Sequence, residues 1–223
     1  FKDLTDIIKV QKLKSDFVAN VSHELRTPLQ SIKLGLETIN NGHAAKDLES
    51  QKKILPVVLQ QTSRMENIVN DLLSLSRIEL QEHIRPNEKV NLNDIISHSI
   101  ELHQEILKKN NIECQFERES KNVKINGDRN RLIEVFNNLI DNGIKYSEKN
   151  KKITIITKSE HKNFLVTIKD QGIGISKENI PQVTERFFRV DPAKSKEVGG
   201  TGLGLAIVKH IVNQHRAEMT ISS

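Results

Sequence analysis

The stretch "DFVANVSHELRTPL", residues 16–29, decides how the first part of the chain folds. Apolar residues recur in it every three or four positions, which predicts an amphipathic helix that continues beyond the stretch. At about 100° per residue, the apolar seam comprises Phe17, Val21, Leu25, Pro28, Ile32, Leu36 and Ile39. His23 falls roughly opposite the centre of this seam, so we expect its imidazole to face solvent.

The helical pattern continues on both sides of this stretch. Turn residues in "NNGHAAKD", residues 40–47, separate two periodic segments, so we predict helices at about 3–41 and 47–82. A helical hairpin cannot bury its apolar stripes alone, and two hairpins that associate into a four-helix bundle overcome this. The pattern therefore predicts a homodimer.

His23 has two interpretations. A histidine in a helix is most often an ordinary surface or core residue. On an exposed face, however, a neutral imidazole can act as a nucleophile, and Glu24 is placed to accept the proton of the other ring nitrogen. Pro28 has no N–H for the Glu24 carbonyl, which indicates either a tolerated kink or a flexible point that repositions His23.

After "RPNE", residues 85–88, the pattern changes to alternating strands and helices. We predict strands at residues 112–118, 122–125, 152–160, 164–170 and 217–222, and helices near 93–109, 129–146 and 203–214. The turn "SEHKN", residues 159–163, makes one strand pair antiparallel. The predicted class is α+β, with the helical hairpin followed by an α/β sandwich rather than a doubly wound fold.

A row of polar side chains follows one face of "RLIEVFNNLIDNGIKYS", residues 131–147. Glu134, Asn138, Asn142 and then Lys145 or Tyr146 are spaced one turn apart. The row could be a solvated face, but asparagines are poor helix formers. Amide oxygens suit a Mg²⁺ ion that bridges phosphates, and a lysine suits phosphate itself.

Two glycine motifs follow. In "DQGIGI", residues 170–175, Asp170 either belongs to a generic turn or accepts a hydrogen bond from an adenine amino group, with Gly172 and Gly174 allowing close approach. In "GGTGLGLAIVKHI", residues 199–211, a glycine-rich loop precedes a helix whose N-terminal N–H groups could bind phosphate. The second motif lacks the βαβ context of a dinucleotide fingerprint.

Together these motifs resemble a known family from about residue 10 to the end of the chain. "FVANVSHELRTPL" resembles the phosphoacceptor box of sensor histidine kinases. The later blocks resemble the ATP-binding domain shared by histidine kinases, Hsp90-type chaperones, gyrase and mismatch-repair ATPases. The implied boxes are an N box (131–147), a first G box (170–175), an F box in "ERFFRVD" (185–191) and a second G box (199–205).

The resemblance implies two domains: a dimerisation and phosphotransfer hairpin at residues 1–84, and an ATP-binding domain at 85–223 whose C-terminal end is missing. It implies that His23 is phosphorylated and that Thr27 positions a water for dephosphorylating a partner. It implies that Asn138 binds Mg²⁺ and that Asp170 binds adenine. It also implies that Asn142, Lys145 and Tyr146 contact phosphate or metal, and that Arg189 contacts phosphate. The phosphate-binding loop would comprise Gly200, Thr201, Gly202, Leu203 and Gly204.

Other positions carry weaker expectations. Residues 176–199 would form a lid over ATP, anchored by Phe187 and Phe188, which could equally be ordinary core residues. Leu34 shares the side of His23, so it belongs either to a docking surface or, misplaced, to the core. Gly143 stands where the family usually has alanine. Glycine in a helix is less favourable than alanine by up to about 1 kcal/mol.

The expected function is Mg·ATP-dependent autophosphorylation of His23, followed by transfer to an aspartate of a response-regulator receiver domain. Within the family, the chain looks most like the phosphate-regulon sensor kinases. One rival is a scaffold that binds ATP and a regulator without transferring phosphate. Another is an ATP-driven clamp like the chaperones or gyrase, which would lack the helical hairpin.

Composition limits the alternatives. The net charge of +5 is spread thinly, with 12 Lys+Arg against 11 Asp+Glu in residues 1–87 and 22 against 18 in residues 88–223, so we expect no nucleic-acid partner. The single cysteine, Cys114, fits a reducing cytoplasm. No stretch approaches the roughly 18 to 20 apolar residues of a membrane span. We expect a soluble cytoplasmic piece of a longer protein anchored in the inner membrane.

Overall fold

The computed structural model describes residues 2–41, 47–119, 124–160 and 163–223. These residues divide into two compact units. The first unit contains residues 1–73 and 199–201, and the second contains residues 74–198 and 202–223. Within the described residues, no helix has the length and apolar character required to cross a membrane.

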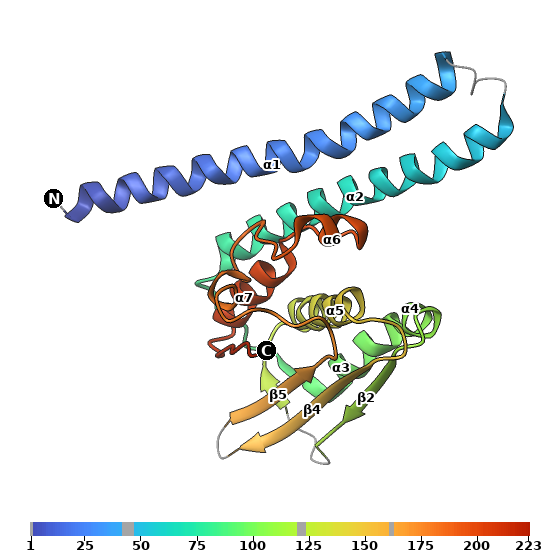
Figure 1. The fold of residues 1–223 in the computed structure, drawn as a ribbon. Coiled ribbons are helices and arrows are strands. Elements are labelled where there is room, and N and C mark those ends of the chain that lie inside the picture. Colours follow the sequence, from blue (N-terminus) through green and yellow to red (C-terminus); the bar gives the residue numbers. More distant parts are fainter. Residues whose placement is uncertain (1, 42–46, 120–123, 161–162) are drawn as a thin grey trace. The chain divides into compact units, whose positions relative to one another are not determined.

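The first unit is built on a helical hairpin. Its helices are α1 (Lys2–Asn41) and α2 (Leu48–Gln81), which run antiparallel to one another (Figure 1). Both agree with the predicted ranges, whereas most of the predicted turn lies outside the described residues. At Gly35 a side-chain Cβ would lie only 2.7 Å from Val58 Cγ2, so the two helices pack closely there.

The predicted seam of α1 is largely confirmed. Pro28 is buried, and the other seam residues are partly buried except Leu36, which is 50% exposed. The side chain of His23 is 73% exposed, as its angular position predicts. Exposed apolar side chains remain along both helices, including Val18, Leu29, Leu36, Leu55, Leu59 and Leu73. A single hairpin therefore leaves part of its apolar stripe uncovered.

The second unit contains the last two turns of α2 and a mixed α/β fold. Its short β1 (Lys89–Asn91) pairs antiparallel with β3 (Lys124–Asn126). A three-stranded sheet has the order β2-β4-β5, with β2 (Glu113–Glu117) parallel to β4 (Lys152–Glu160) and β4 antiparallel to β5 (Asn163–Lys169). The helices are α3 (Leu92–Leu102), α4 (Gln104–Lys109), α5 (Arg129–Tyr146), the 3₁₀ helix Ile180–Gln182, α6 (Pro192–Glu197) and α7 (Gly204–Gln214).

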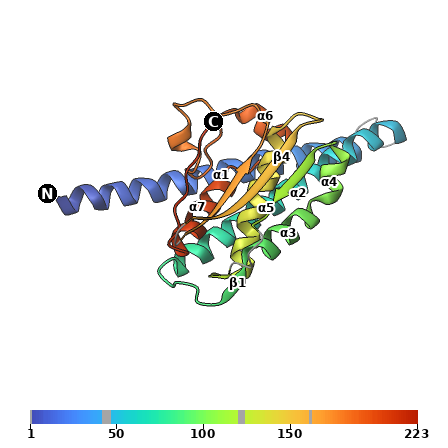
Figure 2. The ribbon, with the colours of Figure 1, turned by 90° about the horizontal axis from the view of Figure 1, so that it is seen from below.

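Helices α3 and α5 lie on one face of the three-stranded sheet, as Figures 1 and 2 both show. The core between these layers contains Ile95 of α3, Phe136 and Ile140 of α5, and Ile153 and Ile155 of β4. Ile95, Ile140, Ile153 and Ile155 have no exposed surface. The α/β sandwich is therefore confirmed, and α5 forms its central helix.

Several short elements differ from the predictions. The predicted strand at 217–222 is wrong, because residues 217–223 are described and form no strand; a strand needs a hydrogen-bonded neighbour, and none of the described strands pairs with them. The predicted helix 93–109 is interrupted at His103. Strand β3 begins at Lys124, and residues 122–123 lie outside the described ranges. Strand β1 and helix α6 were not predicted.

The start of α5 is held by two side chains. Asp128 caps the helix, and its Oδ1 accepts hydrogen bonds from the backbone N–H groups of Asn130 and Arg131 at 2.9 and 3.1 Å. The Asp128 N–H donates to Nε2 of His215 at 3.0 Å, and the Nδ1 of His215 lies 2.8 Å from the carbonyl oxygen of Ile211. The end of α7 thus fixes the start of the helix that carries the polar row.

Cys114 of β2 provides a test of the sheet. Burial raises the pKa of its thiol, so a smaller fraction is thiolate at a given pH in the folded protein than in the unfolded chain. Iodoacetamide at pH 8 should therefore alkylate Cys114 more slowly in buffer than in urea, as measured by intact mass. Equal rates under the two conditions would contradict the packing of β2.

Candidate functional sites

His23 and Glu24 form the centre of the first candidate site. Nδ1 of His23 lies 4.0 Å from Oε1 of Glu24, whose side chain is only 16% exposed. From α2, Nη2 of Arg64 lies 3.3 Å from Oε2 of Glu24. The sequence reasoning missed Arg64, although a charged residue one turn before Ile68 in the buried seam of α2 was a signal.

Two further residues of α1 were predicted to act beside His23. The hydroxyl of Thr27 donates to the carbonyl oxygen of His23 at 3.2 Å. The hydroxyl oxygen keeps its acceptor lone pairs in this arrangement, so it can still accept a hydrogen bond from a water. Leu34 is 65% exposed, so it does not belong to the core of this hairpin.

The polar row of α5 meets the start of α7. The Nδ2 of Asn138 donates to the carbonyl oxygen of Glu134 at 2.9 Å, which leaves Oδ1 as the outward atom. A Cβ built on Gly204 would lie 2.6 Å from that oxygen. Gly204 thus leaves room for a hard oxygen donor, the ligand type that Mg²⁺ prefers. Asn142 is partly buried one turn further along.

Two charged members of the polar row, Glu134 and Lys145, form ion pairs within α5. Arg131 Nη1 lies 3.1 Å from Oε2 of Glu134, and Oε1 of the same carboxylate accepts a hydrogen bond from the hydroxyl of Ser74. Lys145 Nζ lies 2.6 Å from Oδ2 of Asp141. A phosphate that binds Lys145 would share the three N–H donors of its ammonium group with Asp141.

Asp170 follows β5 directly and lies in a loop attached to the end of α5. Its Oδ1 accepts a hydrogen bond from the Gly172 N–H at 2.8 Å, which leaves Oδ2 for a ligand. The Ile173 N–H donates to the Tyr146 carbonyl oxygen at 3.2 Å. A Cβ on Gly172 would lie 2.7 Å from Asp170 Oδ1 and 2.9 Å from the Tyr146 oxygen, and Gly174 has φ +74°. Both glycines of the motif are therefore structurally required.

The absence of a side chain at Gly143 also has a structural reason. A Cβ there would lie 3.0 Å from Cδ1 of Ile153, a core residue of β4, and 3.7 Å from the Cβ of Asp170. The small residue therefore allows α5 to approach β4 beside the Asp170 loop.

The segment predicted as a lid, residues 176–199, is joined to the glycine-rich loop by a backbone contact between Phe187 and Gly202. Phe187 has φ +63°, a left-handed conformation that costs a non-glycine residue roughly 1 to 3 kcal/mol. Its N–H donates to the carbonyl oxygen of Gly202 at 2.8 Å. A Cβ on Gly202 would lie 2.9 Å from the Phe187 Cα. Phe187 therefore has a backbone role, while Phe188 and Arg189 are partly buried.

A contact between residues 176–199 and α5 was not predicted. Ser195 of α6 is 2% exposed, and its hydroxyl lies 3.0 Å from the hydroxyl of Tyr146. Tyr146 therefore contacts the Asp170 loop through its backbone and α6 through its side chain.

The glycine-rich loop ends at α7. Leu203 is fully buried before Gly204, the first residue of the helix. Gly200 is partly buried, and the hydroxyl of Thr201, within the first unit, donates to Oδ2 of Asp71 at 2.6 Å.

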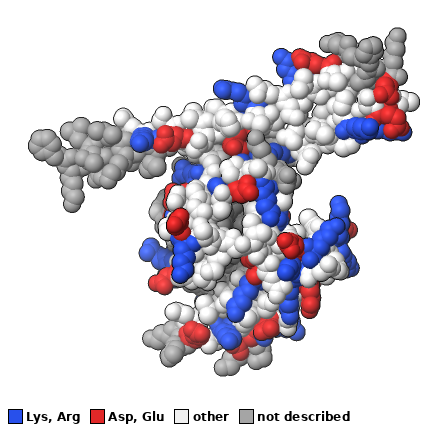
Figure 3. Space-filling model, viewed as in Figure 1, with Lys and Arg blue, Asp and Glu red and all other residues white. Residues whose placement is uncertain are grey.

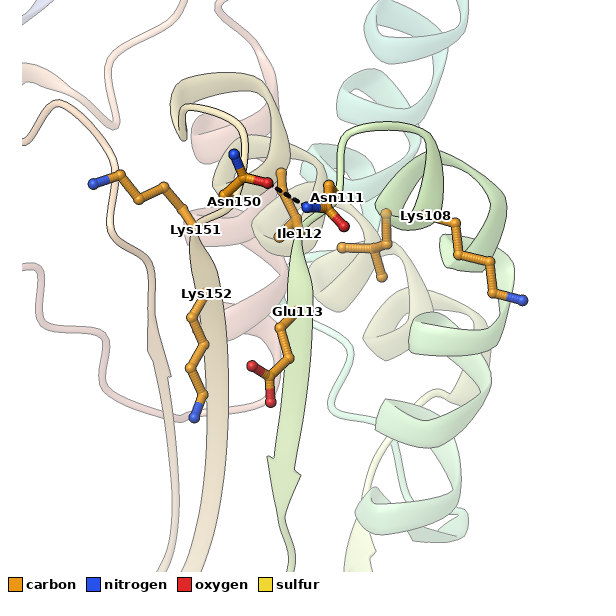
Figure 4. Close-up of a pocket in the computed structure, with 8 residues that line it drawn as sticks. Lys108, Asn111, Ile112, Glu113, Asn150, Lys151 and Lys152 are labelled. Atoms are coloured by element: carbon orange, nitrogen blue, oxygen red, sulfur yellow. Dashed lines mark hydrogen bonds between the residues drawn. The ribbon is translucent and has the colours of Figure 1, made fainter.

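A cavity of about 400 Å³ lies elsewhere in the second unit (Figure 4). Its lining residues are Leu107, Lys108, Asn111, Ile112, Glu113, Asn150, Lys151 and Lys152, and none is a predicted site residue. The side chains of Lys108 and Lys151 point to opposite sides in Figure 4 and do not converge on a common ligand. On the face seen in Figure 3, basic and acidic side chains are interspersed.

Gly204→Ala tests the contact between α5 and α7. The added methyl would lie within 2.6 Å of Asn138 Oδ1 and must displace it. We expect the affinity for Mg·ATP to fall about tenfold, the equivalent of roughly 1.4 kcal/mol, as measured by calorimetric titration. Asn213→Ala, at an exposed position of α7, is the control and should bind Mg·ATP as the wild type does. Equal affinities for the two variants would contradict this geometry.

Comparisons with known proteins agree on both parts of the chain. Residues 13–81 match the family described as "His Kinase A (phospho-acceptor) domain". Residues 127–223 match the family described as "Histidine kinase-, DNA gyrase B-, and HSP90-like ATPase".

Individual relatives extend this result. The chain is 35% identical over 223 residues to the phosphate regulon sensor protein PhoR of Pseudomonas aeruginosa. The alignment covers 100% of this chain but only 50% of that relative, so the chain spans about half of the relative's length. The structure of the mycobacterial sensor histidine kinase MprB is 30% identical, with 58% of this chain and 80% of that chain covered and a TM-score of 0.50. The structure of histidine kinase ThkA in complex with response regulator protein TrrA is 25% identical, with 85% and 55% covered and a TM-score of 0.68.

Proposed function

The chain belongs to the histidine kinase family, and on that basis we propose that it uses Mg·ATP to phosphorylate its own His23. The observation that carries this proposal is the imidazole of His23, which is 73% exposed and has the carboxylate of Glu24 within 4.0 Å of Nδ1. An exposed imidazole with an adjacent carboxylate has the parts that nucleophilic catalysis requires.

The proposed reaction starts with the lone pair on Nε2 of His23. This pair forms the N–P bond with the γ-phosphorus of ATP as the bond from phosphorus to the bridging oxygen breaks, and its electrons leave with ADP. The Nδ1 proton passes to Oε1 of Glu24 and then to solvent. Beyond this, the protein contributes position and charge, as is usual in phosphoryl transfer.

In the second unit, the proposed nucleotide contacts come from three motifs. Asp170 would accept a hydrogen bond from the adenine amino group beside Gly172 and Gly174. Mg²⁺ held by Oδ1 of Asn138 would neutralise phosphate charge. The remaining phosphate contacts would come from Asn142, Lys145, Tyr146, Arg189 and the loop formed by Gly200, Thr201, Gly202, Leu203 and Gly204.

The proposed partners follow from the same family. The phosphoryl group would pass from His23 to an aspartate of a response regulator, as the complex of ThkA with TrrA suggests. Thr27 would position a water that hydrolyses the phosphoryl group from the regulator's aspartate and releases inorganic phosphate, which is a separate phosphatase reaction. The uncovered apolar stripe of the hairpin supports a homodimer, and the similarity to PhoR supports a role in phosphate sensing.

We also propose that the functional domains divide at residues 84 and 85. The hairpin would carry dimerisation and phosphotransfer, and the following part would bind ATP. Both would lie in the cytoplasm as part of a longer, membrane-anchored kinase.

The test is incubation of the protein with γ-labelled ATP and Mg²⁺. We expect protein-bound label that is lost in acid and stable in base, because a phosphoramidate has that stability. Nucleotide binding without any protein-bound label would favour a scaffold, and steady ATP turnover without label would favour an ATP-driven clamp. Acid-stable label would indicate a different acceptor residue.

A further inference from the structure

Arg64 is the one charged side chain that is buried among the residues whose side chains are described, with 8% of its surface exposed. It lies in the buried seam of α2, one turn before Ile68. A buried guanidinium is costly unless it is paired, and apolar residues of similar volume often stabilise such a position as well or better. Its presence in an otherwise apolar seam therefore points to a purpose other than stability.

The position of Arg64 relative to Glu24 indicates that purpose. Nη2 of Arg64 lies 3.3 Å from Oε2 of Glu24, across the hairpin from α2 to α1. The other carboxylate oxygen, Oε1, is the one that faces Nδ1 of His23, at 4.0 Å. The two oxygens of a single carboxylate are thus divided between Arg64 and His23.

This division has a chemical consequence. A glutamate side chain has three rotatable bonds and would otherwise sample several rotamers. A carboxylate held against Nδ1 favours the tautomer with its proton on Nδ1, and that tautomer has its lone pair on Nε2. The separation of 4.0 Å is too long for a hydrogen bond, but rotation of the exposed imidazole can shorten it.

We propose that Arg64 is a positioning residue for the phosphorylation of His23. Its guanidinium holds Oε2 of Glu24 so that Oε1 is directed at Nδ1 and the nucleophilic electron pair is on Nε2. Arg64 contacts neither substrate nor the reacting atoms and acts only through Glu24. This inference rests on the proposed autokinase function.

The kinetic test uses Arg64→Met, which fits the apolar seam, and Arg64→Lys, which keeps the charge without the planar fork. At saturating Mg·ATP, we expect Arg64→Met to slow single-turnover labelling of His23 by about 10- to 100-fold, the scale of a mispositioned catalytic group. Arg64→Lys should be intermediate, and the Kd for ATP should stay within about twofold in both. Arg77→Met, at an exposed position of the same helix, should label as the wild type.

A double-mutant cycle separates positioning from packing. If Arg64 acts through Glu24, Arg64→Met should cause no further loss of rate in a Glu24→Gln background. Losses that multiply would overturn the proposal, as would a wild-type rate in Arg64→Met. Circular dichroism identifies a variant that fails to fold, in which case Arg64→Lys carries the test.

A readout without nucleotide separates this proposal from the proposed function. Nitrogen-15 NMR of the His23 ring should show mainly the Nδ1–H tautomer in the wild type, and Arg64→Met should shift it toward the mixture typical of an exposed histidine. If the wild type never becomes labelled, the autokinase assignment fails, yet a tautomer shift still supports positioning by Arg64. An unchanged tautomer in Arg64→Met overturns the positioning role.

Discussion

Replacing His23 with glutamine is expected to abolish the base-stable phosphoprotein while nucleotide binding persists. Glutamine keeps the polarity and approximate length of the side chain but offers no nucleophilic nitrogen, because its amide lone pair is delocalised. Since the His23 side chain is 73% exposed, the substitution should change the free energy of unfolding by no more than about 0.5 kcal/mol. Gel autoradiography measures the label, and calorimetry with ATP measures binding.

His83→Gln is the matched control, because His83 is also an exposed histidine. It should become labelled at the wild-type rate. Label that persists in His23→Gln would place the acceptor elsewhere in the chain. Loss of ATP binding in that variant would mean that the substitution has effects beyond the nucleophile.

Replacing Asn138 with alanine is expected to remove most Mg²⁺-dependent ATP binding. The substitution deletes Oδ1, the atom that faces Gly204 beside the start of α7. Mutation of a residue that supports a metal ligand typically lowers metal affinity roughly 10- to 100-fold. Deletion of a direct ligand should therefore lower the affinity at least that much. Titrations with ATP in Mg²⁺ and in EDTA measure the effect, which should largely disappear in EDTA.

Asn130→Ala, at an exposed position in the first turn of the same helix, should bind Mg·ATP as the wild type does. It controls for the loss of an amide side chain from α5. An Asn138→Ala variant with wild-type affinity in Mg²⁺ would exclude Asn138 as a metal ligand. An equal loss in EDTA would mean that Asn138 contacts the nucleotide directly.

The long periodic elements of this fold could be predicted from the sequence because each contains its own signal. The boundaries of α5 and β4 agree with the predicted ranges, since Asp128 caps the one and alternating burial marks the other. Short elements depend on their neighbours instead. Strand β1 exists only through its pairing with β3, and the predicted strand at 217–222 is absent because no described strand pairs with it.

In the candidate sites, too, residues with a local sequence signal could be predicted, whereas contacts between distant parts of the chain could not. Glycine spacing and the polar row pointed to residues that the fold then brings together, as with Asn138 and Gly204. Arg64 and Ser195 were missed because their partners lie 40 and 49 positions away along the chain. The pair of Asp141 with Lys145 has i, i+4 spacing and was within reach of sequence reasoning.

Pro28 gives α1 a mechanical property of its own. The helix continues through this proline, which supplies no N–H to the Glu24 carbonyl four residues earlier. Backbone hydrogen bonds resist twisting of a helix, so if Pro28 acts as a flexible point rather than as a tolerated kink, we expect α1 to twist most easily where this hydrogen bond is missing. A rotation of the N-terminal part of α1 about the helix axis would then be concentrated in the turn that carries His23. It would change the orientation of the imidazole more than it would rotate the residues after Pro28.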